Sequence, residues 1–249
     1  MGFLRYILIF FWRIWFYILT LSLTIILFPV LIIVISRENW YPYFYKLARI
    51  WAKIILFGMG FIPKITYDEE IIQHKSYVFA PNHTSIIDVM LMLYLTKNPF
   101  VFLGKKELAK IPVFGFVYKR TCILVDRNNS KSRNNAFNEA KKRLEKGLSV
   151  CIYPEGKVPD DESVILDKFK SGAFRLAIMF QIPVVPVTLY DCKKRFSFTF
   201  FSGKPGVLRA RVHKFIYTEN LNFDQVNDLK DQTHQIIYNE LKNDLDSKN

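Results

Sequence analysis

Cysteine and histidine are scarce in this chain of 249 residues, which holds three cysteines and four histidines. The cysteines are scattered at Cys122, Cys151 and Cys192, and none belongs to a C-x-x-C pair. Such an odd, sparse set excludes a disulfide framework and indicates a reducing compartment. No spacing of Cys, His, Asp or Glu resembles a metal site. The sequence therefore predicts no bound metal, and each cysteine is expected to be a small buried residue.

Acidic residues are too few to balance the basic ones. Lys and Arg number 35 against 22 Asp and Glu, and the net charge is +13. Residues 104–146 alone hold 12 basic and 4 acidic side chains. A chain of this kind meets an anionic partner, such as nucleic acid, a phospholipid surface or a phosphorylated small molecule. A solvated basic face would explain residues 104–146 equally well.

Charge is nearly absent from the first 35 residues. Between Phe3 and Ile35 only Arg5 and Arg13 are charged. The window Ile14–Ile35 would leave Arg13 free to reach the lipid head groups, and its length of about 22 residues suffices to cross a bilayer core of about 30 Å. We expect a membrane helix here, or a hairpin of two shorter helices within one leaflet. No small-x-small cleavage site follows the run, which disfavours a signal peptide.

The segment after the apolar run is basic, with five cations between residues 37 and 64 opposed only by Glu38. By the positive-inside tendency, the following domain is expected on the cytoplasmic side of the cell membrane. Residues 40–62 mix aromatic and basic side chains, which predicts an amphipathic helix, either interfacial or packed on the core. The chain is therefore divided into anchoring helices over residues 1–62 and one cytoplasmic domain over residues 63–249.

Short apolar runs alternate with helical patterns after residue 75. This alternation predicts an α/β fold, a largely parallel mixed sheet flanked by helices. The expected strands are 77–81, 100–103, 121–125, 150–153, 184–189 and 207–216. The expected helices are 86–96, a broken helix over 105–120, then 130–147, 169–180 and 223–245.

The stretch FAPNHTSIID, residues 79–88, places His83 between a strand and a helix, with Asp88 five residues later. A carboxylate beside an imidazole can fix the ring tautomer and stabilise the imidazolium, so that the other nitrogen accepts a proton. The alternative is a purely structural role in a capped helix, because Ser85-x-x-Asp88 resembles a capping box. That alternative explains Asp88 but not His83 or Asn82.

Further segments in a fixed order accompany His83 and Asp88, and together they resemble the glycerolipid acyltransferase family, in particular its 1-acylglycerol-3-phosphate acyltransferases. The resemblance covers roughly residues 75–190 and extends to FKSGAF at residues 169–174. The four matching blocks are Asn82, His83 and Asp88; Lys105, Lys106, Glu107, Leu108, Ile111, Pro112, Gly115, Asp126 and Arg127; Tyr153, Pro154, Glu155 and Gly156; and Ile182, Pro183, Pro186 and Val187.

This resemblance implies a glycerolipid acyltransferase-like fold and the transfer of a fatty acyl group from a thioester to a lysophospholipid hydroxyl. His83 would be the general base and Asp88 its orienting carboxylate. The donor would be acyl-CoA or an acyl carrier protein, and no cofactor is implied. Ser85 is better explained as a helix cap than as a nucleophile.

The other site residues implied by the resemblance would bind the acceptor. Lys105 and Arg127 would hold its phosphate, Glu155 would position its glycerol part, and backbone N–H groups at the helix start or near Gly156 would stabilise the oxyanion. The family's Thr-Arg after Glu-Gly is Lys157-Val158 here. Lys157 can replace the charge of that arginine but not its bidentate fork.

Three alternatives to this reaction stay open. The acceptor could be another lysolipid, the enzyme could be a lipid thioesterase or hydrolase that uses water, or the chain could be a non-catalytic membrane- or nucleic-acid-binding protein. The basic segment and the membrane helix favour a phosphorylated lipid over water. We therefore expect a phospholipid membrane, a lysophospholipid and an acyl thioester as partners, with acyl carrier protein as one form of the donor, and no nucleic acid.

Overall fold

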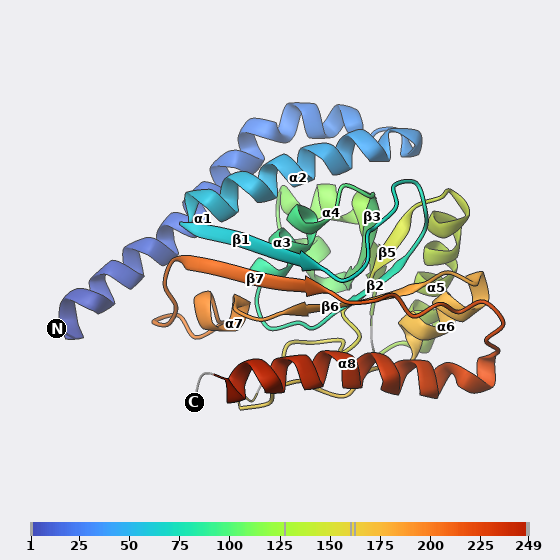
Figure 1. The fold of residues 1–249 in the computed structure, drawn as a ribbon. Helices are drawn as coiled ribbons and strands as arrows, with labels where there is room; N and C mark the ends of the chain where they lie inside the picture. The colour runs from blue at the N-terminus through green and yellow to red at the C-terminus, as the bar shows by residue number, and fades with distance from the viewer. Residues whose placement is uncertain (1, 127, 160, 162, 248–249) are drawn as a thin grey trace. The chain divides into compact units, whose positions relative to one another are not determined.

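The computed structural model describes residues 2–126, 128–159, 161 and 163–247 (Figure 1). The α-helices are α1 (Gly2–Val34), α2 (Tyr41–Gly58), α3 (Ile87–Leu95), α4 (Phe114–Thr121), α5 (Ser130–Glu145), α6 (Gly172–Phe180), α7 (Cys192–Arg195) and α8 (Val226–Asp246). Short 3-10 helices are η1 (Glu38–Trp40), η2 (Lys106–Lys110) and η3 (Phe223–Gln225). The strands are β1 (Phe61–Tyr67), β2 (Val78–Pro81), β3 (Phe100–Lys105), β4 (Ile123–Val125), β5 (Ser149–Cys151), β6 (Val184–Leu189) and β7 (Gly206–Val212).

The seven strands follow the order β1-β7-β6-β2-β5-β3-β4. The pairs β2–β6, β2–β5, β3–β5 and β3–β4 are parallel, and Val78 lies opposite both Val150 and Val184. Every residue of β2, β5 and β6 is buried, as expected for parallel strands covered on both faces. The predicted α/β fold with a largely parallel sheet is therefore confirmed.

The main difference from the expected elements lies at residues 59–67. The predicted helix 40–62 ends at Gly58, and β1 begins at Phe61. Gly60 has a φ of +74°, the left-handed conformation with which glycine commonly ends a helix. β1 contains Pro63, which an edge strand tolerates because its outer N–H groups have no ladder partner. The sequence pattern missed β1 because apolar residues continue unbroken from the helix into the strand.

The chain divides into two compact units, and the predicted division at residues 62 and 63 stays a prediction. Unit 1 comprises residues 1–65, 84–97 and 189–210, and unit 2 comprises residues 66–83, 98–188 and 211–249. The boundary between His83 and Thr84 separates the two members of the predicted catalytic pair. Each unit is therefore described by itself.

In unit 1, α1 and α2 form an antiparallel hairpin joined by tryptophan side chains. The indole N–H of Trp15 donates to the Gly58 carbonyl at 2.9 Å, and that of Trp51 donates to the Thr24 hydroxyl at 3.1 Å. The apolar run is one helix of 33 residues with a mean hydropathy of 2.6 in its best window. By length and composition, α1 can therefore cross a membrane as a single helix.

Arg13 contradicts the expectation that its side chain is free to reach lipid head groups. It is only 2% exposed, although α1 as a whole exposes most of its large apolar side chains. Its guanidinium donates to the carbonyl oxygens of Ser197, Thr199 and Ser202 at 2.8, 3.0 and 2.9 Å. The charge is therefore held by backbone oxygens of the same unit.

Helix α2 packs one face on α3, which confirms the packing role, and its other face is exposed, so its interfacial role stays a prediction. Tyr45 donates through its hydroxyl to the Thr96 carbonyl at 3.1 Å, and Arg49 Nε donates to the Leu93 carbonyl at 3.0 Å. The exposed apolar side chains are Tyr43, Ile50, Ile54 and Phe57. This second face suits a membrane interface.

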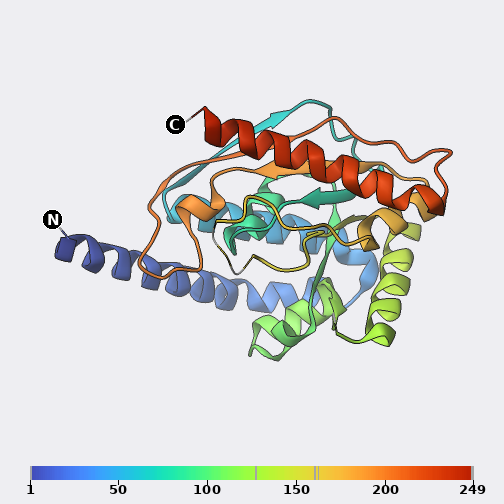
Figure 2. The ribbon, with the colours of Figure 1, turned by 90° about the horizontal axis from the view of Figure 1, so that it is seen from below.

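In unit 2, α6 contacts α5, α8 and strand β2, so these helices flank the parallel strands (Figure 2). The core between them contains the fully buried rings of Phe79, Phe100 and Phe174. α5 ends before Gly147, whose φ of +75° is the left-handed conformation with which glycine commonly closes a helix. This packing holds the ends of β2 and β5, which carry the candidate site.

Candidate active site

The His83 segment begins where β2 ends, in the middle of the sheet. Asn82 is buried and His83 is half-buried. β5 is parallel to β2 with Phe79 opposite Cys151, so residues 153–156 leave the sheet at the same edge as His83. Ligands of open α/β sheets bind outside this carboxyl edge. Unit 2 thus brings together two of the predicted segments, His83 and the Tyr153–Gly156 block.

Glu155 is the residue that holds the His83 segment in place. Its side chain is 3% exposed, and Oε1 accepts a hydrogen bond from the His83 backbone N–H at 2.7 Å. Oε2 accepts from the backbone N–H of Asp167 at 3.0 Å. One buried carboxylate therefore connects two loops, and charge-assisted bonds of this kind are stronger than neutral ones. The predicted contact between Glu155 and the glycerol part of a substrate stays a prediction.

Aromatic stacking orders the imidazole of His83. Its ring lies on the ring of Tyr153 with centroids 4.1 Å apart and an interplanar angle of 22°. Tyr153 in turn faces Phe102 at 6.2 Å and 7°. A half-buried imidazole against an aromatic wall has few accessible rotamers, which is what a proton-transfer group needs. Tyr153 and Phe102 were missed as site residues because their spacing gives no chemical signal.

Gly156 makes the turn that follows Glu155. It has a φ of +80°, and its N–H donates to the Tyr153 carbonyl at 3.0 Å. That N–H is thus engaged in the turn, which favours other N–H groups as oxyanion donors. A Cβ at Gly156 would lie 2.8 Å from Nζ of Lys170, so the glycine lets this ammonium approach the turn.

Lys170 is a cation that the sequence did not single out as a site residue. It is exposed, and its N–H donates to the Pro154 carbonyl at 2.9 Å. The FKSGAF segment was the available signal, but nothing in its pattern placed it beside Gly156. Among the predicted cations, Lys105 and Lys157 are exposed, whereas Arg127 lies outside the described residues.

Unit 1 contains Asp88 and Ser85, at the start of α3. Asp88 is fully buried, and its Oδ2 accepts from the N–H groups of Thr84 and Ser85 at 2.6 and 2.8 Å. Ser85 Oγ accepts from the Ile87 N–H at 3.2 Å and donates to the Phe196 carbonyl. The Ser85 hydroxyl thus accepts the N–H of the first residue of α3, as a capping side chain does, from the position before Ile86 at the helix N-terminus. Asp88 fixes the backbone directly after His83, and its role in orienting the imidazole stays a prediction.

Cys151 and Cys192 are buried as expected, whereas Cys122 is half-buried. Burial raises the pKa of the Cys122 thiol to about 12, and it raises the pKa of Cys151 and of Cys192 well above the usual range. A raised pKa disfavours the thiolate, which is the nucleophilic form of cysteine. Within the described part of the chain, no three His, Cys, Asp or Glu residues gather in a metal-binding group.

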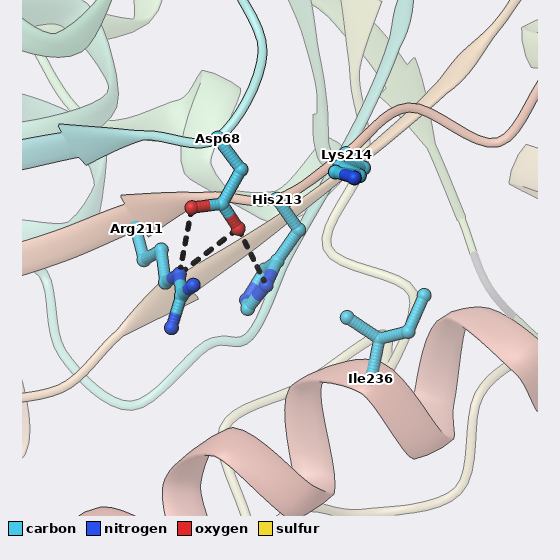
Figure 3. A pocket seen from close by; sticks show the side chains of 5 residues that line it. All are labelled: Asp68, Arg211, His213, Lys214 and Ile236. Atoms are coloured by element: carbon cyan, nitrogen blue, oxygen red, sulfur yellow. Dashed lines mark hydrogen bonds and ion pairs between the residues drawn. The ribbon is translucent and has the colours of Figure 1, made fainter.

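A hollow of about 400 Å³ in unit 2 is separate from the His83 segment (Figure 3). Its polar side chains satisfy one another: Arg211 Nε lies 3.0 Å from both carboxylate oxygens of Asp68, and His213 Nε2 lies 2.7 Å from the Thr188 hydroxyl. Arg211 also donates to Glu240 at 3.1 Å. These contacts explain the cluster as a structural network.

Comparison with known proteins identifies the family of the chain. The Acyltransferase family model matches residues 63–190, more than half of the chain, and the chain belongs to this family. It is an enzyme of the acyltransferase class, which confirms the resemblance of its four sequence blocks.

Individual relatives carry more specific names. The chain is 28% identical to a 1-acyl-sn-glycerol-3-phosphate acyltransferase of Haemophilus influenzae over 184 residues, covering 73% of this chain and 74% of the relative. It is 31% identical to human 1-acyl-sn-glycerol-3-phosphate acyltransferase beta over 168 residues, 64% of this chain and 58% of the relative. The crystal structure of the 1-acyl-sn-glycerophosphate (LPA) acyltransferase PlsC from Thermotoga maritima matches with a TM-score of 0.78. It covers 96% of this chain and 97% of that chain at 18% identity, which shows the same fold.

Proposed function

We propose that the enzyme transfers a fatty acyl group from a thioester to the sn-2 hydroxyl of 1-acylglycerol 3-phosphate, giving phosphatidic acid. The names of the relatives support this acceptor. The observation that carries the proposal is the His83 segment, whose half-buried imidazole stacks on Tyr153 while Glu155 holds its backbone at 2.7 Å. This arrangement supplies an ordered proton acceptor at the carboxyl edge of a parallel sheet.

In the proposed reaction, His83 removes the proton of the acceptor hydroxyl as its oxygen attacks the thioester carbonyl carbon. The new C–O bond gives a tetrahedral oxyanion, and its collapse breaks the C–S bond. The thiolate leaves and receives the proton from His83. Asp88 stabilises the imidazolium during these steps. Because Ser85 caps α3, the transfer is direct and has no acyl-enzyme.

The acceptor phosphate is held by cations from three segments of unit 2. Lys105 ends β3, and Lys157 and Lys170 belong to the loops beside Gly156. Arg127 is proposed as a further phosphate ligand from its place in the motif. Lysine ammonium groups can compensate for the missing Thr-Arg because a phosphate accepts point charges as well as a bidentate fork.

The enzyme is proposed to work at the cell membrane, held by the apolar surface of α1, with its catalytic residues on the cytoplasmic side. The donor is acyl-CoA or an acyl carrier protein, and the reaction requires no other cofactor. Nucleic acid is not a partner in this proposal. The apolar exposure of α1 and the basic residues that follow it support this arrangement.

The test is acyl transfer by the detergent-purified full chain to labelled lysophosphatidic acid, with acyl-CoA and acyl carrier protein supplied separately as donors. The variants are His83→Ala and, as a matched control, His74→Asn. His74 is exposed and has a φ of +67°, which asparagine tolerates. The loss of a general base lowers the rate by about 10²–10⁴-fold, so His83→Ala should lose that factor while His74→Asn keeps its activity.

Other results would change the proposed acceptor or reaction, or overturn the proposed mechanism. Transfer only to a different lysolipid would retain the reaction but change the acceptor. Thioester hydrolysis without transfer to any lysolipid would favour the thioesterase alternative. Transfer that survives in His83→Ala would overturn the mechanism.

A further inference from the structure

Residues 196–202 of unit 1, here called the aromatic loop, expose apolar side chains that the proposed reaction does not use. The loop reads FSFTFFS and lies between α7 and β7. Phe198 is 64% exposed and Phe201 is 49% exposed. Large apolar groups gathered at one exposed site mark a contact surface rather than an ordinary loop tip.

The loop is held in one conformation by polar contacts within unit 1. The Ser197 and Ser202 hydroxyls lie 2.6 Å apart, and the Lys204 N–H donates to the Arg195 carbonyl at 3.2 Å. Arg13 binds the carbonyl oxygens of Ser197, Thr199 and Ser202. Irregular backbone is excluded from a lipid environment chiefly because its polar groups lack partners there. Arg13 removes much of that penalty by binding three carbonyl groups of the loop.

The loop also continues the apolar surface of α1. The ring of Phe201 meets Tyr6 at 5.5 Å, and the ring of Phe200 meets Phe10 at 6.1 Å. Both ribbon views show the loop beside the N-terminal half of α1 (Figures 1 and 2). The two segments thus form one aromatic surface, built from ring pairs that lie 195 and 190 positions apart in the chain.

The residues that flank the loop are basic. Lys194 and Lys204 are exposed, and no acidic residue occurs between residues 192 and 206. Aromatic rings bordered by cations suit the head-group region of a bilayer, where rings enter the interface and lysines bind anionic lipid. A second protein surface would need neither the basic border nor the continuity with α1.

We propose that the aromatic loop inserts Phe198 and Phe201 into the head-group region of a bilayer that contains anionic phospholipid. The loop is then a second membrane contact beside α1, and Arg13 joins the two. The inference rests on the membrane association proposed above but not on the acyl-transfer reaction.

The test places a fluorophore on the loop of the full chain. Phe198→Cys in a Cys122→Ala background is labelled with an environment-sensitive probe, and the chain is reconstituted into phosphatidylcholine vesicles with phosphatidylglycerol. Lys242→Cys, at an exposed position of α8, is the control. Flotation measures membrane association, and quenching by spin-labelled lipid and by aqueous iodide measures the depth of the probe.

We expect the fluorescence emission of the probe at position 198 to be blue-shifted, quenched by spin-labelled lipid and not quenched by iodide. The probe on Lys242→Cys should be quenched by iodide and not by lipid. A chain that floats with the vesicles but carries an iodide-accessible probe at position 198 would overturn this inference alone. A chain that does not float would overturn the proposed membrane association as well. A probe shielded from both quenchers and cross-linked to a second copy would assign the loop to a protein contact instead.

The charge requirement is tested with the labelled loop and Lys194→Gln/Lys204→Gln. These changes should reduce the blue shift of the probe emission on anionic vesicles. The control Lys131→Gln/Lys242→Gln removes the same number of positive charges elsewhere and should not reduce it. An equal response of both pairs would contradict the role of anionic lipid.

Discussion

Arg13 in unit 1 and Glu155 in unit 2 are buried side chains of opposite charge, and each forms hydrogen bonds with the backbone of loops. Arg13 is 2% exposed and Glu155 is 3% exposed. Arg13 donates to three loop carbonyls, and Glu155 accepts from two loop N–H groups. In both cases one charge satisfies the backbone of irregular segments, which could not otherwise be buried at low cost.

The two residues differ in what their loops present. The loop held by Arg13 carries exposed phenylalanines beside a long apolar helix, whereas the loop held by Glu155 carries a stacked, half-buried imidazole. A buried charge therefore need not be a substrate ligand. It can instead be the group that holds an irregular loop in one conformation.

We expect the largest effect on stability and on acyl transfer from Glu155→Ala. Removing the carboxylate leaves the N–H groups of His83 and Asp167 without their acceptor, which should lower the free energy of unfolding by about 2–5 kcal/mol. Acyl transfer should fall to the level of His83→Ala, because the His83 segment loses its position. Chemical denaturation and the transfer assay measure both effects.

Glu155→Gln removes the charge of Glu155 but keeps the size of its side chain. Its amide keeps one acceptor oxygen but turns an NH₂ donor toward the second N–H, so stability and activity should be only partly restored. Full activity in Glu155→Gln would show that neither the charge nor the second acceptor is needed. Full stability in Glu155→Ala would contradict the positioning role.

Arg13→Met should have the next largest effect and act on unit 1. The three carbonyl groups lose their donor, and carbonyls tolerate this better than N–H groups, so a cost of about 1–3 kcal/mol is expected. The aromatic loop should become sensitive to chymotrypsin, which cleaves after exposed phenylalanines. Arg5→Met is the matched control, because Arg5 is exposed on the same helix. Equal cleavage of the two variants would contradict the proposed support by Arg13.

Ser85→Ala tests a contact at the edge of the same loop. Ser85 Oγ caps α3 and donates to the Phe196 carbonyl, so its loss should lower stability by about 1 kcal/mol. Acyl transfer should fall by less than tenfold, because the hydroxyl is not a nucleophile. A loss as large as that of His83→Ala would revive an acyl-serine mechanism.

The sequence predicted the α/β fold and the His83 segment because both depend on local patterns and on ordered blocks. The strands appear as short apolar runs, and His83 and Glu155 stand at the ends of such runs. The partners of Arg13 lie 184 to 189 residues away, and no pattern connects them. Lys170 was missed as a site residue for a similar reason, since only the loop geometry brings its ammonium beside Gly156.

His213 is also a buried titratable group, but its partners are side chains rather than backbone groups. Burial is the main cause that lowers the pKa of His213; Glu240 opposes it, Arg211 lowers the pKa further, and Asp68 has the smallest, opposite effect. The ring also contacts the Thr188 hydroxyl at 2.7 Å. Burial likewise lowers the pKa of His234, so both histidines disfavour a proton in the folded state.

The smallest predicted effect is therefore a dependence of stability on pH. Because the folded pKa lies below the unfolded value of about 6.5, the unfolded chain binds more protons, and stability is lost as the pH falls from about 6.5 through the folded pKa. His213→Gln keeps an amide near Thr188 but cannot titrate, so its unfolding free energy should fall less steeply over this range. Adding His234→Gln should flatten the curve further. Denaturant titrations of the three proteins at several pH values measure the slope of unfolding free energy against pH. If both variants have the slope of the wild type, burial of these two rings has no energetic consequence, unlike the burial of Arg13 and Glu155.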